Sequence, residues 1–186
     1  MEDILSIITV IAVVLAPIIW LIITLNRKIN KALEKVSEIL NFQIDIPGNI
    51  FRKKKIFGEI DGYRCEIEVF TRSYGRSSTT YVSFYAFFPQ SLDMGIKINW
   101  KGEIDGDDEH LTELFIERND SKVEEAQKTL RRLRVSDTVV NSRKILFIKY
   151  YKPEEIINTM NEVLNLAKSL KSVSYTHLTL PTSSRV

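Results

Sequence analysis

Few residues in this 186-residue chain have the type and spacing needed for chemistry. The one cysteine, Cys65, falls in phase with Ile67 and Val69 in the alternating segment 63–71, a pattern typical of a buried structural thiol. A nucleophilic cysteine needs an activating base or positively charged surroundings, and a position inside a strand supplies neither. We therefore expect Cys65 to have a structural role.

A second group of candidates is the acidic stretch around His110, formed by Asp105, Asp107, Asp108 and Glu109. A zinc site needs further His or Cys ligands, which are not nearby. A calcium loop needs a glutamate that closes its register, and none is in place. With no nucleophile elbow in the sequence, a Ser–His–acid arrangement is also disfavoured. The stretch predicts a solvated loop, so we expect no catalytic residue, no metal site and no cofactor.

Basic residues form two short clusters that suit a negatively charged surface. Near a membrane, each Lys or Arg is attracted to anionic headgroups by roughly 1 kcal/mol. The alternative is a solvated basic segment that protects the edge of a sheet. A formal net charge of +2 argues against a nucleic-acid partner. The residues predicted to contact anionic lipid are Arg27, Lys28, Lys31, Arg52, Lys53, Lys54 and Lys55.

The element that would position these residues is an apolar run from Ile4 to Leu25, which contains no charged residue. As a helix it would extend roughly 33 Å, enough to cross a hydrocarbon core of ~30 Å. An acidic start and the lack of a cleavage site disfavour a signal peptide. The lack of internal charge disfavours a pore. We predict a transmembrane anchor over residues 1–25.

The basic residues after this run predict which side of the membrane the rest of the chain occupies. Lys and Arg are enriched on the cytoplasmic side of membrane spans, and here they all follow the run. A single cysteine is consistent with a reducing compartment. We predict a single-pass protein of the cell membrane with a short external N-terminus and a cytoplasmic C-terminal domain.

Residues 26–47 are predicted to form a juxtamembrane helix and linker. Its apolar residues Ile29, Leu33, Val36 and Leu40 recur at spacings of four, three and four. Two heptads are fewer than a coiled coil requires. The stripe therefore leaves open a helix that packs on its own domain, a helix that continues the anchor, or a seam that pairs with a second copy or another membrane protein.

Residues 48–172 are predicted to form one α+β domain, a mostly antiparallel sheet covered on one face by two helices. Asp61-Gly62 predicts a hairpin turn, because this dipeptide tolerates positive φ angles. The expected strands are 55–60, 63–71, 80–88, 95–100, 114–117 and 144–151. The expected helices are 121–133, with Ser121 and Glu124 as a capping box, and 153–170.

Three short patterns carry a resemblance to a known architecture. They are Gly58 and Gly62 before a strand, Gly106-Asp107 ahead of residues 114–116, and Leu-Arg-Arg-Leu at 130–133. Over residues 55–170 the chain resembles a group of uncharacterised prokaryotic single-pass membrane proteins with a small α+β domain. The resemblance implies this architecture and no particular activity.

The segment Val173–Thr182, VSYTHLTLPT, resembles a translated sequencing adaptor. This implies that residues 173–186 form a non-native tail and that the natural sequence after about Ser172 is missing. Such a tail would be excluded from reasoning about the fold.

Taken together, these features predict a membrane-anchored cytoplasmic module that binds or scaffolds an unidentified ligand. The alternative is an accessory subunit that assembles a membrane complex through the anchor and the stripe on the juxtamembrane helix. A membrane-tethered enzyme is the third hypothesis.

Overall fold

The computed structural model describes residues 2–47 and 52–175, with side chains from Val13 to Leu170 apart from Val14. The helices are α1 (Glu2–Leu40), α2 (Glu109–Thr129), the short 3-10 helix η1 (Ile148–Tyr151) and α3 (Pro153–Tyr175). The strands are β1 (Gln43–Asp45), β2 (Lys54–Ile60), β3 (Tyr63–Tyr74), β4 (Ser77–Phe87), β5 (Lys97–Ile98), β6 (Ile104–Asp105), β7 (Arg134–Val135) and β8 (Val139–Ile145).

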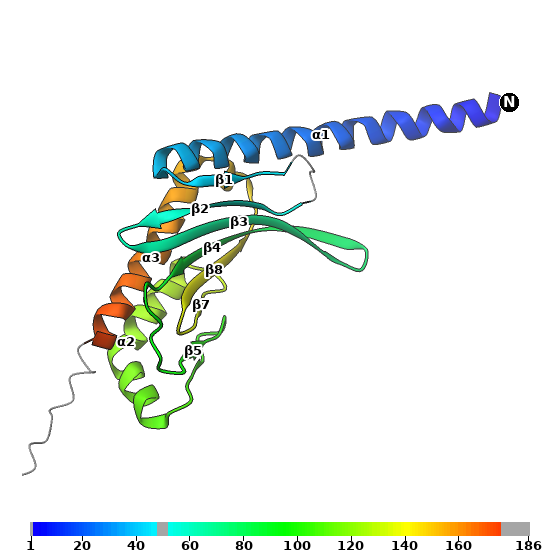
Figure 1. The fold of residues 1–186 in the computed structure, drawn as a ribbon. Helices are drawn as coiled ribbons and strands as arrows, with labels where there is room; N and C mark the ends of the chain where they lie inside the picture. The colour runs from blue at the N-terminus through cyan, green and yellow to red at the C-terminus, as the bar shows by residue number, and fades with distance from the viewer. Residues whose placement is uncertain (1, 48–51, 176–186) are drawn as a thin grey trace, which may run out of the picture.

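All eight strands belong to one antiparallel sheet with the order β1-β2-β3-β4-β8-β7-β5-β6. The chain builds β1 to β4 in sequence and returns with β8 beside β4 after β5, β6, α2 and β7. The tip of the long β3–β4 hairpin extends to the same side of the molecule as the N-terminus of α1 (Figure 1). The expected α+β fold with an antiparallel sheet is confirmed.

The β2–β3 hairpin forms where the sequence predicts it. Asp61 and Gly62 have φ angles of 53° and 80°, and Ile60 pairs with Tyr63 across the turn. Positive φ at both central residues is the geometry of a type I′ turn, whose twist matches that of the flanking strands. The turn fixes the register, and so places Cys65 and Ile67 on the buried face.

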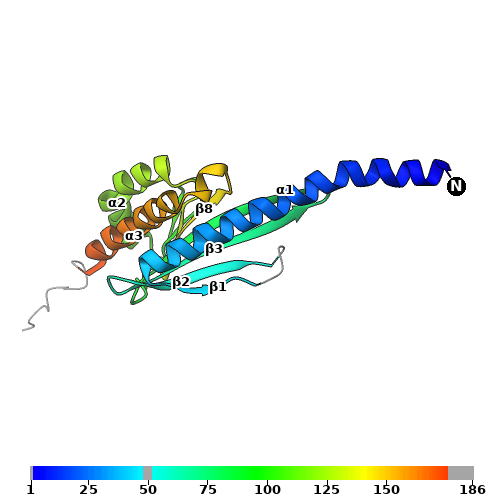
Figure 2. The ribbon, with the colours of Figure 1, turned by 90° about the horizontal axis from the view of Figure 1, so that it is seen from above.

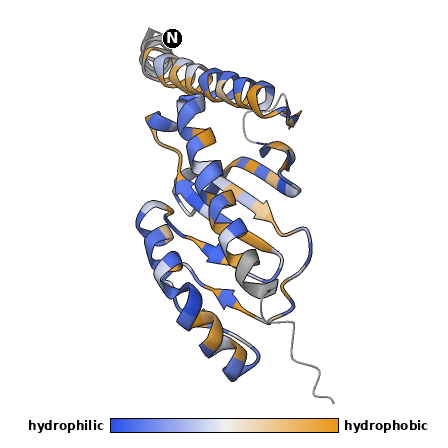
Figure 3. Cartoon of the chain, turned by 90° about the vertical axis from the view of Figure 1, so that its left-hand side faces the viewer, coloured by the Kyte–Doolittle hydropathy of each residue, from blue (hydrophilic) through white to orange (hydrophobic). Residues whose placement is uncertain are grey.

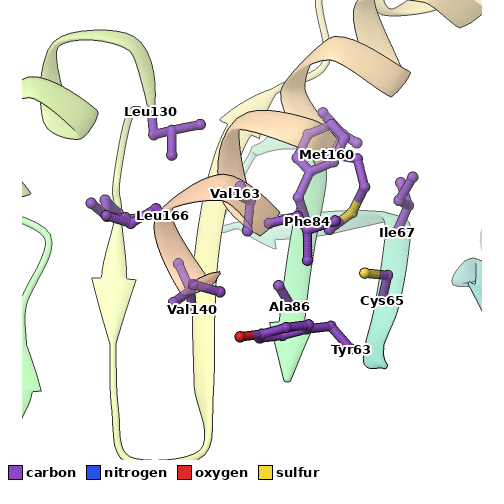
Figure 4. Packing of buried hydrophobic residues seen from close by; sticks show 14 of the residues in the cluster. Tyr63, Cys65, Ile67, Phe84, Ala86, Leu130, Val140, Met160, Val163 and Leu166 are labelled. Carbon is purple, nitrogen blue, oxygen red and sulfur yellow. The ribbon is translucent and has the colours of Figure 1, made fainter. Parts of the chain in front are cut away.

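The hydrophobic core lies between one face of the sheet and the helices. Ile67, Phe84 and Val140 point from neighbouring strands toward Met160 and Val163 of α3 (Figure 4). The second half of α1 lies beside α3 and over β1 and β2, and α2 packs against α3 and β6 (Figure 2). Hydrophobic and hydrophilic residues are interspersed along these helices, as expected for helices that bury one face (Figure 3).

The expected cover of two helices is therefore corrected to three, because the second half of α1 joins the core. Ile29, Leu33 and Val36 are 3%, 0% and 0% exposed. The helix ends in a Schellman motif: Asn41 has a φ of 54°, and the Phe42 N–H donates to the Ser37 carbonyl over 2.8 Å. Two of the alternatives for the apolar stripe are therefore observed together: the helix packs on the chain's own domain, and it continues the helix of the apolar run 4–25.

The predicted strand 114–117 is wrong, because these residues lie inside α2. The helix begins twelve residues earlier than the predicted Ser121 start, at Glu109, with Asp108 as N-cap: its carboxylate accepts from the Leu111 N–H over 2.8 Å. The buried residues of α2 are Phe115, Asn119 and Val123, spaced by four. Leu114, Phe115 and Ile116 are consecutive apolar residues, and periodicity alone does not tell a short apolar run in a helix from a strand.

The predicted strand 144–151 is also corrected, because only its first two residues belong to a strand. β8 starts earlier, at Val139, and ends at Ile145, while Ile148–Tyr151 form η1. β8 pairs with β4 along its whole length but with β7 only at Val140 and Asn141. Its last four residues, 142–145, therefore have no paired strand on that side among the described residues and lie at an open edge of the sheet.

Among the described residues no helix is long and apolar enough to cross a membrane. The membrane-spanning part of the expected fold stays a prediction.

The C-terminal helix α3 starts at Pro153, as predicted, and runs to Tyr175. The predicted tail begins inside this last turn, at Val173. Its remaining residues, 176–186, lie outside the described part of the chain.

Candidate functional site

The first half of α1 projects beyond the sheet (Figure 1). Between Val13 and Ile22 it presents seven large apolar side chains that are 44–68% exposed. They are Val13, Leu15, Ile18, Ile19, Trp20, Leu21 and Ile22. Exposed apolar patches of this kind mark sites of interaction with protein or lipid.

A cavity of about 460 Å³ lies where α1 extends beyond the α+β domain, and we call it the exit cavity. α1 contributes Ile22, Leu25, Asn26 and Ile29, and the β3–β4 hairpin and β8 form much of the opposite wall. Two of the basic residues predicted to contact lipid, Arg52 and Lys54, also line it. The cavity therefore combines an apolar wall from the projecting helix with two positive charges.

Lys54 is the most unusual residue of the exit cavity. Its side chain is almost fully buried, at 4% exposed, and its ammonium donates a hydrogen bond to the Asn26 side-chain oxygen. No carboxylate within the described part of the chain forms an ion pair with it. Burial lowers the pKa of Lys54, because desolvation disfavours the charged ammonium. An anion in the cavity would supply the missing counter-charge.

The structure separates the remaining predicted lipid contacts into two groups. Arg27, Lys28 and Lys31 are exposed on α1, close to the projecting half. By contrast, Lys53 and Lys55 lie away from Lys54, in ion pairs with Glu68 at 2.5 Å and with Glu66 at 2.7 Å. Alternation along β2 explains the difference, because Lys54 and Ile56 share one face of the strand and Lys55 the other. The expected cluster 52–55 therefore does not act as one patch.

The face of the sheet opposite the helices carries aromatic and charged side chains. Phe70 and Tyr81 stack with ring centroids 5.9 Å apart, and the guanidinium of Arg143 lies 5.2 Å from the Phe70 ring. The guanidinium carbon of Arg72 lies 5.5 Å from the centroid of the same ring. Paired charges and cation–π contacts cover this face in place of a second layer of helices.

A second cavity, of about 570 Å³, lies at the open edge of β8, and we call it the β8-edge cavity. It is lined by residues from three places in the sequence. These are Thr129, Arg131 and Arg132 at the end of α2, Arg143, Lys144 and Ile145 of β8, and Phe147, Lys149 and Tyr150 at η1. Sequence patterns did not indicate this site, because residues 129–132 and 143–150 are separated in the chain by the segment 133–142.

The residues around His110 have structural positions. Asp108 caps α2, His110 is exposed in the first turn of the helix, and Asp107 packs where a side chain on Gly95 would lie. Across the part of the chain that the structure describes, no group of three or more His, Cys, Asp or Glu residues is placed to hold a metal ion. The loop is not a unified site in this structure.

Cys65 is fully buried under the helices, as its phase with Ile67 predicted (Figure 4). Burial raises the pKa of the Cys65 thiol to about 12, because the apolar core disfavours the thiolate. The thiol stays protonated and unreactive in the folded protein.

The raised pKa predicts a loss of stability in alkali. Between about pH 9 and pH 12 the unfolded chain releases the Cys65 proton while the folded chain keeps it, so stability falls as pH rises. The limiting slope is about 1.4 kcal/mol per pH unit. We expect the free-energy difference between the wild type and Cys65→Ala, measured by urea unfolding, to decrease above pH 9 and stay constant below it. A constant difference across the range would contradict the assignment.

Comparisons with known proteins found no match to a family model, to a curated protein or to a solved structure. Function therefore has to follow from the geometry of the chain itself.

Proposed function

We propose that the protein is a membrane-anchored binding module whose apolar N-terminal run lies in a lipid bilayer. The observation that carries this proposal is the exposure of every described large apolar side chain between Val13 and Ile22 on a projecting helix. The sequence extends the same character from Ile4 to Leu25 with no charged residue. Leaving this surface in water is costly, and a bilayer would remove it from water.

The charges next to the run support an orientation. Arg27, Lys28 and Lys31 are exposed just after the apolar residues, where they are free to contact headgroups. Basic residues of this kind favour the cytoplasmic side. In the proposed arrangement the α+β domain therefore lies on the cytoplasmic surface, with the short N-terminus on the other side.

The exit cavity supports a binding role at that surface. It opens beside the part of α1 that would emerge from the bilayer, and it contains the buried Lys54 with Arg52. A lipid with an anionic headgroup satisfies both features, since its phosphate would neutralise Lys54 while its apolar part follows Ile22 and Leu25. The proposed ligand class of the module is therefore anionic lipid.

Charged substitutions in the projecting helix test the anchor. Each Asp near the middle of a span costs about 2.5–3.5 kcal/mol, so Val13→Asp with Ile18→Asp is expected to reduce membrane insertion strongly. The measurement is flotation of the full chain, synthesised without cells in the presence of phosphatidylcholine vesicles, followed by carbonate extraction. The wild type should float and resist extraction, and the double variant should remain at the bottom of the gradient.

The matched control is Ile39→Asp with Ile44→Asp, which places the same two charges on exposed apolar residues of the body. This variant should float like the wild type. If the wild type does not float, or if both double variants lose flotation equally, the anchor proposal is wrong.

The hypothesis of an accessory subunit loses its proposed contact surface. Ile29, Leu33 and Val36 of the stripe are buried against the chain's own sheet and α3, so they are not available to a second chain. A contact with another chain through α1 would therefore use its projecting half.

A further inference from the structure

We propose that the β8-edge cavity is a binding site for a phosphate group. Five of its nine lining residues are basic and none is acidic: Arg131, Arg132, Arg143, Lys144 and Lys149. Basic residues distributed over a protein surface normally alternate with acidic ones. Here the end of α2, strand β8 and helix η1 contribute only basic charged side chains to the β8-edge cavity.

The basic residues of the cavity lack carboxylate partners. The ion pairs that the described residues form involve other basic side chains, namely Lys53, Lys55, Arg64, Lys101, Lys128 and Lys168. Arg143 donates to the Ser83 hydroxyl over 3.2 Å, and the Arg132 guanidinium lies 5.6 Å from the Tyr81 ring. Neither contact neutralises charge, so five positive charges remain for an external anion.

One residue of the lining also carries a buried polar group without a partner. Tyr150 lines the cavity, is fully buried, and its hydroxyl has no hydrogen-bond partner among the described residues. A buried hydroxyl without a partner is destabilising, so it is rarely retained without a reason. A phosphate oxygen is an acceptor that the hydroxyl could donate to, and Arg and Lys are the side chains that bind phosphate most often.

The cavity also lies close to the proposed membrane surface. Ile145 lines both this cavity and the exit cavity, which places the two side by side. Phe147 and Ile148 next to it are 56% and 81% exposed, and η1 contacts α1. The phosphate could therefore belong to a lipid headgroup or to a free phosphorylated compound, and the chemistry of recognition is the same.

The first arm of the test uses inorganic pyrophosphate and the full chain in a neutral detergent, measured by calorimetry. Saturable binding is expected for the wild type. The double variant Arg131→Gln with Lys149→Gln should weaken it by about tenfold or more, because two charge-assisted hydrogen bonds are removed. The control Lys35→Gln with Arg118→Gln removes the same charge from exposed residues elsewhere and should change affinity by less than about twofold.

Tyr150→Phe separates a binding role from a structural one. Without pyrophosphate the variant should melt at the same temperature as the wild type or higher, because it removes an unpartnered hydroxyl. With pyrophosphate its affinity should fall severalfold. A variant that melts earlier and binds normally would show that the hydroxyl has a structural partner instead, and would count against the site.

The second arm identifies the source of the phosphate. The full chain is placed in nanodiscs of phosphatidylcholine and phosphatidylglycerol at a ratio of nine to one, and retained lipids are counted by native mass spectrometry. Loss of bound phosphatidylglycerol in the Arg131→Gln, Lys149→Gln variant, and not in the control, supports a lipid headgroup. Pyrophosphate binding without selective lipid retention supports a free phosphorylated compound. If neither probe distinguishes the double variant from the control, the site is disproved, whatever flotation shows about the anchor.

Discussion

Leu33→Ala is expected to lower the free energy of unfolding of the whole domain by about 2–5 kcal/mol, the range for removing a large aliphatic side chain from a packed core. Leu33 is 0% exposed and lies in the half of α1 that covers β2 and packs beside α3. Urea unfolding of the full chain in a non-ionic detergent measures this change.

The control is Ile39→Ala, on the same helix six residues further along. Ile39 is 56% exposed, so its truncation should change stability by less than about 0.5 kcal/mol. Equal effects of the two substitutions would mean that α1 does not belong to the core. Both variants leave the apolar run 4–25 unchanged, which keeps this test separate from membrane insertion.

If Leu33→Ala lowers the stability as expected, the second half of α1 is an integral part of the folded domain. One helix then continues from the proposed membrane segment into the core, without a flexible linker between them. Such a link fixes the distance of the sheet and its two cavities from the bilayer. Such a link favours binding of lipid headgroups over binding of soluble partners far from the membrane, because little conformational freedom is lost when the headgroup binds.

The local features of the fold could be predicted from the sequence because they depend on short-range patterns. Alternation over 63–71 placed Cys65 on the buried face, alternation over 80–88 predicted a strand there, and Asp61-Gly62 placed the turn. In contrast, α2 was divided into a strand and a shorter helix. Leu114, Phe115 and Ile116 are consecutive and the buried residue one turn later is Asn119, so the helical period of the apolar residues is weak. Asp108 could be identified as the cap only once the helix was known to start there.

The two cavities described above depend on long-range contacts and were harder to predict from the sequence. One signal for Lys54 was present, because alternation along β2 places it on the same face as the buried Ile56. The β8-edge cavity had no such signal. It requires the pairing of β7 with β8, which folds the chain back after residue 136 and brings Arg143 near Arg131.

Asp137→Ala is expected to destabilise the protein by about 2–4 kcal/mol, because one carboxylate supports a whole loop through charge-assisted hydrogen bonds. Its two oxygens accept from the backbone N–H groups of Met94, Gly95 and Ile96 over 3.4, 2.9 and 3.3 Å. The loop includes positive φ angles of 50° at Asp93 and 67° at Gly95, so it needs such support. Without the carboxylate these donors lose their acceptor where little water reaches them.

The comparison with Asp137→Asn identifies the cause. Asparagine keeps one acceptor oxygen but turns an NH₂ group toward the remaining donors, so it should retain part of the stability that alanine loses. Asp93→Asn is the matched control, since it removes an exposed carboxylate that accepts none of these three hydrogen bonds and keeps a side chain that tolerates the positive φ at this position. Urea unfolding should rank the three as Asp137→Ala, Asp137→Asn and Asp93→Asn in order of decreasing loss. If Asp93→Asn costs as much as Asp137→Ala, general loss of negative charge explains the effect. The Asp137 carboxylate would then not be what supports the loop formed by residues 93–96.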